Sequence, residues 1–261
     1  MIKGERQAKM MALLEERQYL SVGELTEALH FSPATIRRDI RALVRAGYAR
    51  KSYGGIALSQ TVAPLAVREH EHFSEKAAVA AAGVALVQEG QTVFVAGSST
   101  AAQLLRPLGA LRDITVVTTD LQMALSLERL GVKTYTTGGR LSDGMCVGAM
   151  ATDALRKMSF DIAFFSVAGV SEAGELLVFS EEFGLLLREV SARAARVVCL
   201  STKEKYKKQA FFSAMDLGGL THFVSDAPAD KSLQERFPQV EFLVADGRGN
   251  KPKQSMIVLA T

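Results

Sequence analysis

The chain has 261 residues, of which 48% are hydrophobic and 23% are charged. This balance excludes a disordered or fibrous protein and allows two globular domains of unequal size. The formal net charge is +3, but residues 1–60 carry ten Lys or Arg against six Asp or Glu, so the first quarter is basic and the remainder is nearly neutral. A basic first quarter predicts contact with a polyanion.

The two cysteines, Cys146 and Cys199, lie far apart, and no charged-then-apolar leader opens the chain. Both features predict a protein of the reducing cytoplasm. The longest apolar runs, such as residues 77–87, are shorter than the roughly 20 residues that span a bilayer, so we expect no membrane partner.

The first elements in chain order are two helices. Apolar positions at helical spacing predict a helix over residues 5–16. Ser21 and Glu24 form a capping-box pair, which predicts a second, short helix that stops near His30.

A third helix is predicted from Ser32, a suitable N-cap, to Gly47, and it combines an apolar stripe with a strongly cationic face. A β-wing is predicted to follow, with its turn at Gly54–Gly55. Because the major groove admits one α-helix whose short polar and Arg side chains contact bases, this pattern predicts DNA binding. The predicted contact residues are Ser32, Thr35, Arg37, Arg38 and Arg41 on the helix and Arg50, Lys51 and Tyr53 in the wing. The alternative for the basic helix is a solvated surface.

We therefore expect a DNA-binding domain over residues 1–57. Residues 58–73 lose periodicity and include Pro64, which predicts an interdomain linker. Residues 74–261 alternate helical and strand-like segments, which is typical of an α/β domain with a mostly parallel sheet. Its strands are expected at 92–96, 114–118, 132–136, 162–167, 196–200, 222–224 and 240–244, and helices at 74–88 and 121–130.

One loop of the larger domain has the composition of an anion site. Gly97, Ser98, Ser99 and Thr100 follow a predicted strand and are expected to open a helix, whose N-terminal N–H groups attract an anion. Asp120 is a candidate for binding sugar hydroxyls or, alternatively, an N-cap. Lys205 is a candidate for neutralising a phosphate or, alternatively, part of a solvated basic loop with Lys203, Lys207 and Lys208.

The segment Phe31-Ser32-Pro33-Ala34-Thr35-Ile36-Arg37-Arg38-Asp39-Ile40, with Leu43, Gly47, Arg50 and Gly54-Gly55, resembles the signature of DeoR-type bacterial transcriptional regulators. The resemblance implies a winged helix-turn-helix joined to a sensor domain similar to ribose-5-phosphate isomerase. It also implies a repressor of a carbohydrate-metabolism operon that releases double-stranded operator DNA when a phosphorylated sugar binds. Asp39 is expected either to orient a neighbouring Arg or to be a surface charge. A homodimer or homotetramer is expected, since operators with two half-sites need two reading heads.

Gly138 and Gly139 follow another predicted strand, at the edge where open α/β sheets bind ligands, and are further effector-binding candidates. The resemblance extends to the larger domain, where it adds Lys76. Glu182, or its neighbour Glu181, is a candidate acceptor for sugar hydroxyls. This chain also departs from the family pattern. Ala96 stands where an Asp is usual, Ser99 replaces a Thr, Thr119 replaces an Asn, Leu187 or Arg188 replaces a Lys, and the usual Asp-Ser-Ser-Lys appears as Thr202-Lys203-Glu204-Lys205. These changes keep a constitutive regulator without an effector as an alternative.

A sugar-phosphate isomerase-like enzyme is a third reading, because a fold can host several functions. Its candidate acids, Asp120, Asp161 and Glu182, are scattered, and we expect no enzyme activity and no cofactor. The four histidines do not combine with cysteines at ligand spacing, and His70 and His72 are read as a surface pair, so no metal is expected.

Overall fold

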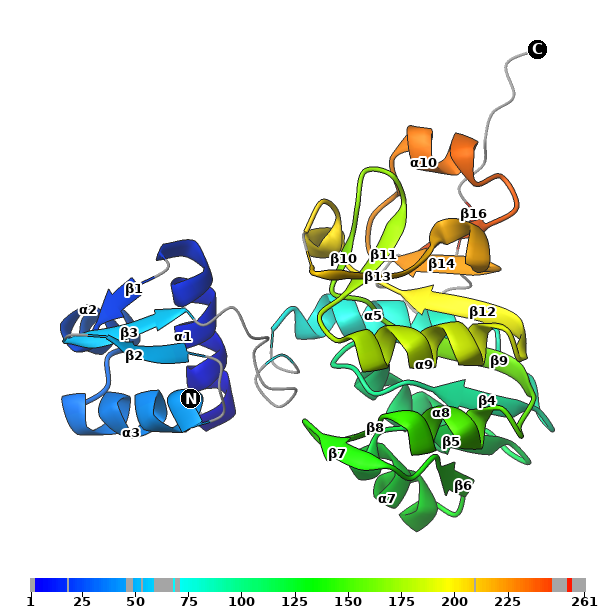
Figure 1. Ribbon diagram of the computed structural model, residues 1–261, viewed down its shortest axis with the longest axis horizontal. Coiled ribbons are helices and arrows are strands. Elements are labelled where there is room, and N and C mark those ends of the chain that lie inside the picture. The colour runs from blue at the N-terminus through cyan, green and yellow to red at the C-terminus, as the bar shows by residue number, and fades with distance from the viewer. Residues whose placement is uncertain are drawn as a thin grey trace. The chain divides into compact units, whose positions relative to one another are not determined.

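The computed structural model describes residues 3–17, 19–45, 49–52, 54–58, 68, 71–208, 210–245 and 253–254. The chain divides into two compact units, residues 1–73 and 74–261 (Figure 1), and each is described by itself. Most of the expected linker, residues 58–73, lies outside the described residues.

The first unit consists of three helices and a small antiparallel sheet. Its helices are α1 (Lys3–Arg17), α2 (Val22–Leu29) and α3 (Pro33–Arg45), and its strands are β1 (Tyr19–Ser21), β2 (Ala49–Ser52) and β3 (Gly55–Leu58), in the order β1-β3-β2. The strand β1 was not predicted, because three residues are too few to show alternation. It pairs with β3 so closely that a Cβ on Gly55 would lie 2.2 Å from the carbonyl oxygen of Leu20.

Local capping explains where the helices of this unit begin and end. The Ser21 hydroxyl accepts a hydrogen bond from the Glu24 N–H (3.1 Å), and the Glu24 carboxylate accepts one from the Ser21 N–H (2.8 Å), which is the predicted capping box. The helix α2 ends at His30, which adopts a left-handed conformation. Leu14, Leu25, Ile36 and Leu43 pack into one core and fix the three helices on each other.

The second unit is built on an eight-stranded sheet in the order β16-β15-β14-β12-β9-β4-β5-β6, parallel except for β16. The strands are β4 (Thr92–Val95), β5 (Thr115–Thr118), β6 (Lys133–Thr136), β9 (Phe160–Phe165), β12 (Ala194–Leu200), β14 (His222–Ser225), β15 (Glu241–Val244) and β16 (Lys253–Gln254). All seven predicted strands are present, with boundaries within two residues of those expected.

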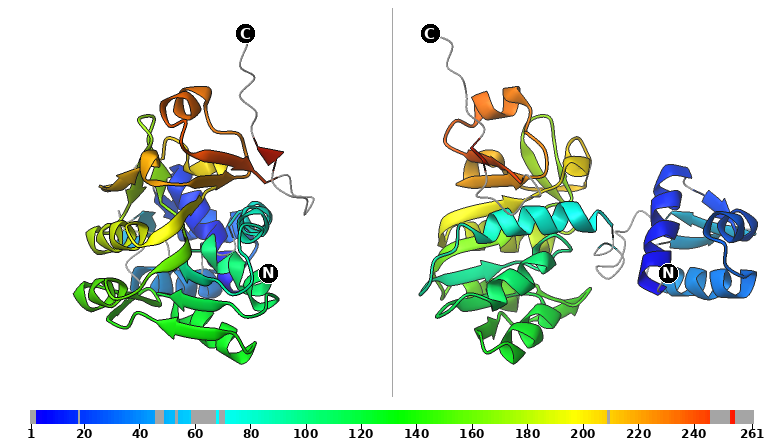
Figure 2. Two further views of the ribbon diagram at one scale, coloured as in Figure 1. Left: turned by 90° about the vertical axis from the view of Figure 1, so that its right-hand side faces the viewer. Right: turned by 180° about the vertical axis from the view of Figure 1, so that it is seen from behind.

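Helices cover both faces of this sheet and make three layers (Figure 2). One face carries α5 (Phe73–Val84), the 3₁₀ helix η1 (Ala101–Leu104), α6 (Leu105–Gly109) and α7 (Leu121–Arg129). The other face carries α8 (Ala149–Leu155), α9 (Glu181–Ser191) and α10 (Lys231–Arg236). Buried strand side chains alternate between two cores, for example Val116 towards α7 and Val117 towards α8. No helix in the described ranges has the length and apolar character to span a bilayer.

Several short elements were not predicted. A second sheet has the order β10 (Gly169–Val170), β11 (Glu175–Val178), β13 (Phe212–Asp216), and a hairpin joins β7 (Arg140–Ser142) to β8 (Met145–Val147). The hairpin turn has positive φ at Asp143 (50°) and Gly144 (79°), as a two-residue turn of this kind requires. The pair Asp143-Gly144, which is typical of a hairpin turn, was the sequence signal that could have predicted this hairpin.

The loop Gly97–Thr100 opens a helix as predicted, and its first turns form a 3₁₀ helix, η1, and not an α-helix. Pro107 has no N–H to donate to the carbonyl group four residues earlier, so an α-helix begun at residue 101 would lose a hydrogen bond there. Pro107 falls instead in the first turn of α6, which begins at Leu105, where proline is tolerated.

The strand order reverses at one point. The chain proceeds outward from β4 to β5 and β6, then returns to β9 on the other side of β4 and proceeds outward again through β12, β14 and β15. Open α/β sheets bind ligands beyond the carboxyl ends of the strands at such a switch point. The loops after β4 and β9 therefore flank the expected position of a ligand.

Candidate DNA-binding surface and effector site

The helix α3 presents an exposed polar face. Arg37, Arg38 and Arg41 are exposed, whereas Ile36 and Ile40 are buried in the core. At the start of α3 the hydroxyl of Ser32 accepts a hydrogen bond from the Thr35 N–H (3.3 Å) and lies 3.0 Å from the Thr35 hydroxyl. The helix thus begins with the predicted cap and has its cationic side towards solvent.

The wing contributes Lys51, whose side chain is exposed on β2. Arg50 lies on the same strand, but its side chain is outside what the structure describes, as is all of Tyr53. Lys51 pairs in register with Ile56 of β3, which is buried in the core of this unit.

Asp39 is not a surface charge, and among the described residues its recorded ion pair is with Arg6 of α1 and not with a neighbouring Arg of α3. It is fully buried and accepts a hydrogen bond from Nε of Arg6 in α1 at 2.5 Å. The guanidinium of Arg6 also stacks over the Phe31 ring, 4.6 Å from its centroid. The sequence predicted an ion-pair partner among the neighbouring Arg residues of the helix, whereas Arg6 lies 33 positions earlier in the chain.

Three side chains meet at the switch point of the large sheet. Nζ of Lys205 donates hydrogen bonds to the hydroxyl of Thr100 (3.1 Å) and to that of Ser166 (2.6 Å). These residues follow β12, β4 and β9 respectively, so three strands bring them together. Thr100 and Lys205 were predicted candidates. Ser166 was missed, although a polar residue near the carboxyl end of a predicted strand was an available signal.

The loop Ser98–Thr100 brings backbone N–H groups near the same point, since its Thr100 hydroxyl accepts a hydrogen bond from Lys205. Ser98, Ser99 and Thr100 are buried, and within the described part of the chain no hydrogen bond is recorded from their N–H groups to a protein acceptor. The Ser98 hydroxyl accepts from the Ala101 N–H (3.0 Å), and the Gly97 N–H donates to the Thr119 hydroxyl (2.8 Å). N–H groups without a recorded protein acceptor are available to bind an anion.

Asp120 serves as the N-cap of α7. Its carboxylate accepts hydrogen bonds from the N–H groups of Gln122 (2.9 Å) and Met123 (3.0 Å). Burial raises the pKa of this carboxyl, the two backbone hydrogen bonds oppose the rise, and the charge of Asp143 adds to it. The N-cap alternative is therefore confirmed.

The remaining candidates lie in other elements, and no contact recorded among the described residues brings all of them together. Glu182, at the start of α9, forms an ion pair with Arg140 of β7, and its Oε1 would lie 3.5 Å from a Cβ on Gly148. A Cβ on Gly139 would lie 2.7 Å from the carbonyl oxygen of Val147, so this glycine allows two chain segments to approach closely. Gly138 has φ of 68° and open space around it, and Lys76 is buried on α5.

Family comparison decides the identity of both units. The model of the DeoR-like helix-turn-helix domain matches residues 6–62, and that of the DeoR C terminal sensor domain matches residues 71–227. The chain belongs to the DeoR family. The resemblance predicted from the sequence is confirmed, and the protein is a DNA-binding transcriptional regulator with a sensor domain.

Full-length relatives of this DeoR-family chain are regulators. The transcriptional repressor AccR of Agrobacterium fabrum is 27% identical over 252 residues, which cover 93% of this chain and 97% of AccR. The HTH-type transcriptional regulator GlpR of Haloferax volcanii is 26% identical over 252 residues, which cover 95% of this chain and 99% of GlpR. Among solved structures, ribose 5-phosphate isomerase A from Methanocaldococcus jannaschii is 23% identical with a TM-score of 0.37 over 51% of this chain and 54% of that chain.

Proposed function

We propose that this DeoR-family protein is a repressor whose α3 enters the major groove of operator DNA. Ser32, Thr35, Arg37 and Arg38, near the start of α3, contact bases or adjacent phosphates, and Arg41, Arg50, Lys51 and Tyr53 add contacts to the backbone or minor groove. The observation that supports this role is the exposed cationic side of α3 above a buried apolar side. The name of AccR supports the repressor role.

A gel-shift experiment with the promoter next to the protein's own gene tests this proposal. Arg37→Ala and Arg38→Ala are expected to weaken operator binding by about tenfold or more each, since a bidentate Arg contact contributes roughly 1 to 3 kcal/mol. Lys9→Ala is the matched control, because Lys9 is exposed on α1 of the same unit. Unchanged binding by both Arg variants would refute the assignment of α3 as the reading helix.

We further propose that the effector is a phosphorylated sugar whose phosphate binds at Ser98–Thr100 and Lys205. The buried loop Ser98–Thr100 has N–H groups without a recorded acceptor among the described residues, and its Thr100 hydroxyl binds the ammonium of the half-buried Lys205, a combination that suits a phosphate. Gly97 belongs to this corner, whereas Lys76, Asp120, Gly138, Gly139 and Glu182 are proposed to shape the pocket around the sugar. Binding there lowers operator affinity by a coupling of about 1 to 3 kcal/mol.

A thermal-shift screen of sugar phosphates, each paired with its unphosphorylated sugar, tests the effector site. A ligand of the folded state raises the melting temperature, and Lys205→Met should abolish the rise. Lys203→Met is the control, because Lys203 lies on the same 3₁₀ helix (η2, Lys203–Lys205) with an exposed side chain.

The constitutive regulator remains the second candidate for a structural reason. The Asp120 carboxylate is used as a helix cap and Glu182 is paired with Arg140, so two candidate hydroxyl acceptors are already engaged. The Met145 side chain also lies against Gly97, beside the N–H groups of the loop. No stabilisation by any sugar phosphate in the screen would favour this candidate.

A further inference from the structure

The strand β6 leaves one edge of the eight-stranded sheet unpaired. Within the described residues it pairs only with β5, and Lys133, Tyr135 and Thr136 are exposed. An exposed edge of unpaired N–H and C=O groups is a template for another strand, and proteins usually cover, shorten or charge it. The strand β6 is short, with four residues, and carries one charge, that of Lys133. Its ammonium lies over the ring of Tyr135, 5.7 Å from the centroid, so the charge is directed to an aromatic face of the same strand.

Apolar side chains gather on β6 and on the elements that adjoin it in the chain. Four of the ten large apolar side chains that are exposed among the described residues lie between positions 125 and 141: Leu125, Leu130, Tyr135 and Leu141. Leu125 is in α7, Leu130 is the C-cap that follows it, Tyr135 is in β6 and Leu141 is in β7, and α7 packs on β6. An apolar surface beside an open strand edge is typical of a protein interface.

We infer that β6 pairs antiparallel with β6 of a second copy, so that one sheet runs through a dimer. Directly opposed residue pairs in an antiparallel ladder alternate between hydrogen-bonded and non-hydrogen-bonded types, and pairs related by a two-fold axis must be of the same type. The axis therefore passes through one pair, in which a residue lies opposite the same residue of the second copy. Centring the axis on Thr134 places each Lys133 opposite the partner's Tyr135, and no like charges face each other. Centring the axis on Tyr135 would place Lys133 opposite the partner's Thr137, and Thr137 is buried.

The strand composition suits this pairing. Thr and Tyr favour strands, and opposed Thr–Thr and cation–aromatic pairs stabilise an antiparallel ladder. The Lys133 ammonium already binds an aromatic face within its own chain, and the same chemistry serves across the axis.

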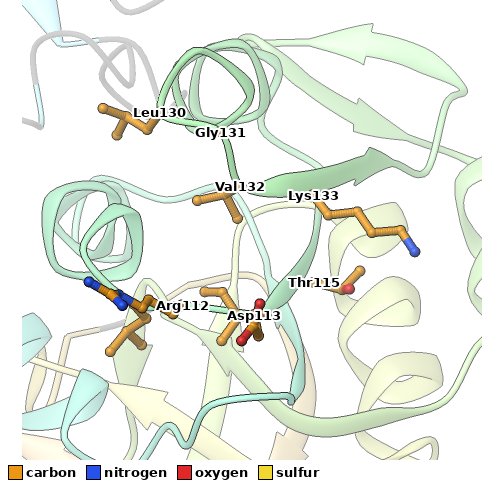
Figure 3. Close-up of a pocket in the computed structure, with 9 residues that line it drawn as sticks. Arg112, Asp113, Thr115, Leu130, Gly131, Val132 and Lys133 are labelled. Carbon is orange, nitrogen blue, oxygen red and sulfur yellow. The ribbon is translucent and has the colours of Figure 1, made fainter.

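A pocket lies at the amino end of β6 (Figure 3). It has a volume of about 500 Å³ and is lined by residues 111–115 and 130–133, with Arg112, Asp113 and Lys133 among them. In the Thr134-centred register, the partner's chain leaves its β6 beside Val132 and Lys133, at the mouth of this pocket. The second copy therefore covers both the open edge and the adjacent hollow.

A charge-swap experiment on the full-length chain tests the inference. Thr134→Glu and Thr134→Lys each place like charges across the axis, so each variant should raise the dimer dissociation constant at least tenfold in sedimentation velocity at low salt. An equimolar mixture of the two should restore association, because Glu then faces Lys.

Thr136→Glu and Thr136→Lys are the matched controls. Thr136 lies on the same strand, but in this register the two copies of position 136 are about 14 Å apart at 3.4 Å per residue. Their mixture should associate no better than either variant alone. Far-UV circular dichroism confirms that each variant is folded.

A wild-type monomer at about 100 μM, or a Thr134→Glu dimer as stable as wild type, would overturn the inference. Failure of the Thr134 mixture to recover, with both variants folded, would overturn it as well. None of these results depends on whether the sensor domain binds a phosphorylated sugar, so the two proposals fail separately.

Discussion

The guanidinium of Arg6 in α1 and the carboxylate of Asp39 in α3 form a buried ion pair at 2.5 Å, with side-chain exposures of 8% and 0%. Asp39 stands between Arg38 and Ile40 on the proposed reading helix, so this pair fixes the helix to α1 from behind. In the motif Arg37-Arg38-Asp39, the two arginine side chains are exposed to solvent, and the buried aspartate binds the helix to α1.

Removing either partner of this pair should destabilise the first unit. Asp39→Ala leaves Arg6 buried without its counter-ion, and such losses cost about 3 to 5 kcal/mol. Replacing both partners with apolar residues, Arg6→Met with Asp39→Leu, should cost less than either single change. Urea unfolding followed by circular dichroism measures this, and hydrogen exchange of α3 locates it. A single-variant cost below about 1 kcal/mol would contradict a buried pair.

Gly97 is expected to be intolerant of a side chain because of Met145. A Cβ at Gly97 would lie 2.5 Å from Cγ and 2.6 Å from Sδ of Met145, so Gly97→Ala should cost about 1 to 3 kcal/mol through overpacking. Adding Met145→Ala should recover part of this cost, which a double-mutant cycle by thermal denaturation would detect.

Gly109→Ala is the control for that cycle. Its Cβ would meet Cδ1 of the exposed Leu130 at 2.5 Å, and the end of an exposed side chain moves easily. Gly109 is the last residue of α6 and is not among the glycines with positive φ, so its backbone conformation is open to Ala. If Gly97→Ala proved as harmless as Gly109→Ala, Met145 would not restrict the loop.

Asp120 should make folding stability depend on pH in an identifiable direction. Burial raises the pKa of its carboxyl in the folded state above the ordinary value of 3.8, so the folded chain binds more protons than the unfolded chain between the two values. Wild type should therefore gain stability relative to Asp120→Asn as pH falls from 7 through the folded pKa, with no further gain below the unfolded value. Asn at position 120 keeps the N-cap, so the comparison isolates the charge. If wild type instead lost stability relative to Asp120→Asn as the pH falls, the folded chain would stabilise the ionised carboxylate, and the prediction would be wrong.

Lys51 and Arg38 should differ in how they affect DNA binding. Lys51→Ala removes a proposed phosphate contact, so it should weaken binding to operator and to unrelated DNA alike and reduce the slope of log K against log salt by about 1. Arg38→Ala should weaken operator binding more than non-specific binding. Fluorescence anisotropy at several salt concentrations distinguishes them, and equal loss of specificity in both variants would contradict the division of roles.

The sequence predicted the helices and strands that are marked by patterns within a few neighbouring residues. The capping box at Ser21 and Glu24 and the alternating segments of the large domain were readable, because capping and side-chain periodicity act within one turn or one strand. Short elements such as β1 were missed, since three residues carry no period and β1 exists only because β3 offers it a partner.

The amino-acid sequence by itself determined the DeoR-type reading motif, the basic first quarter and the alternation of strands and helices. Only the tertiary structure decided that Asp39 binds Arg6, that Ser166 joins Thr100 around Lys205, and that the Asp120 carboxylate is used as a cap. The physical reason is that pairing of polar groups depends on proximity in space, and here the partners lie up to 105 positions apart and are brought together by the sheet order.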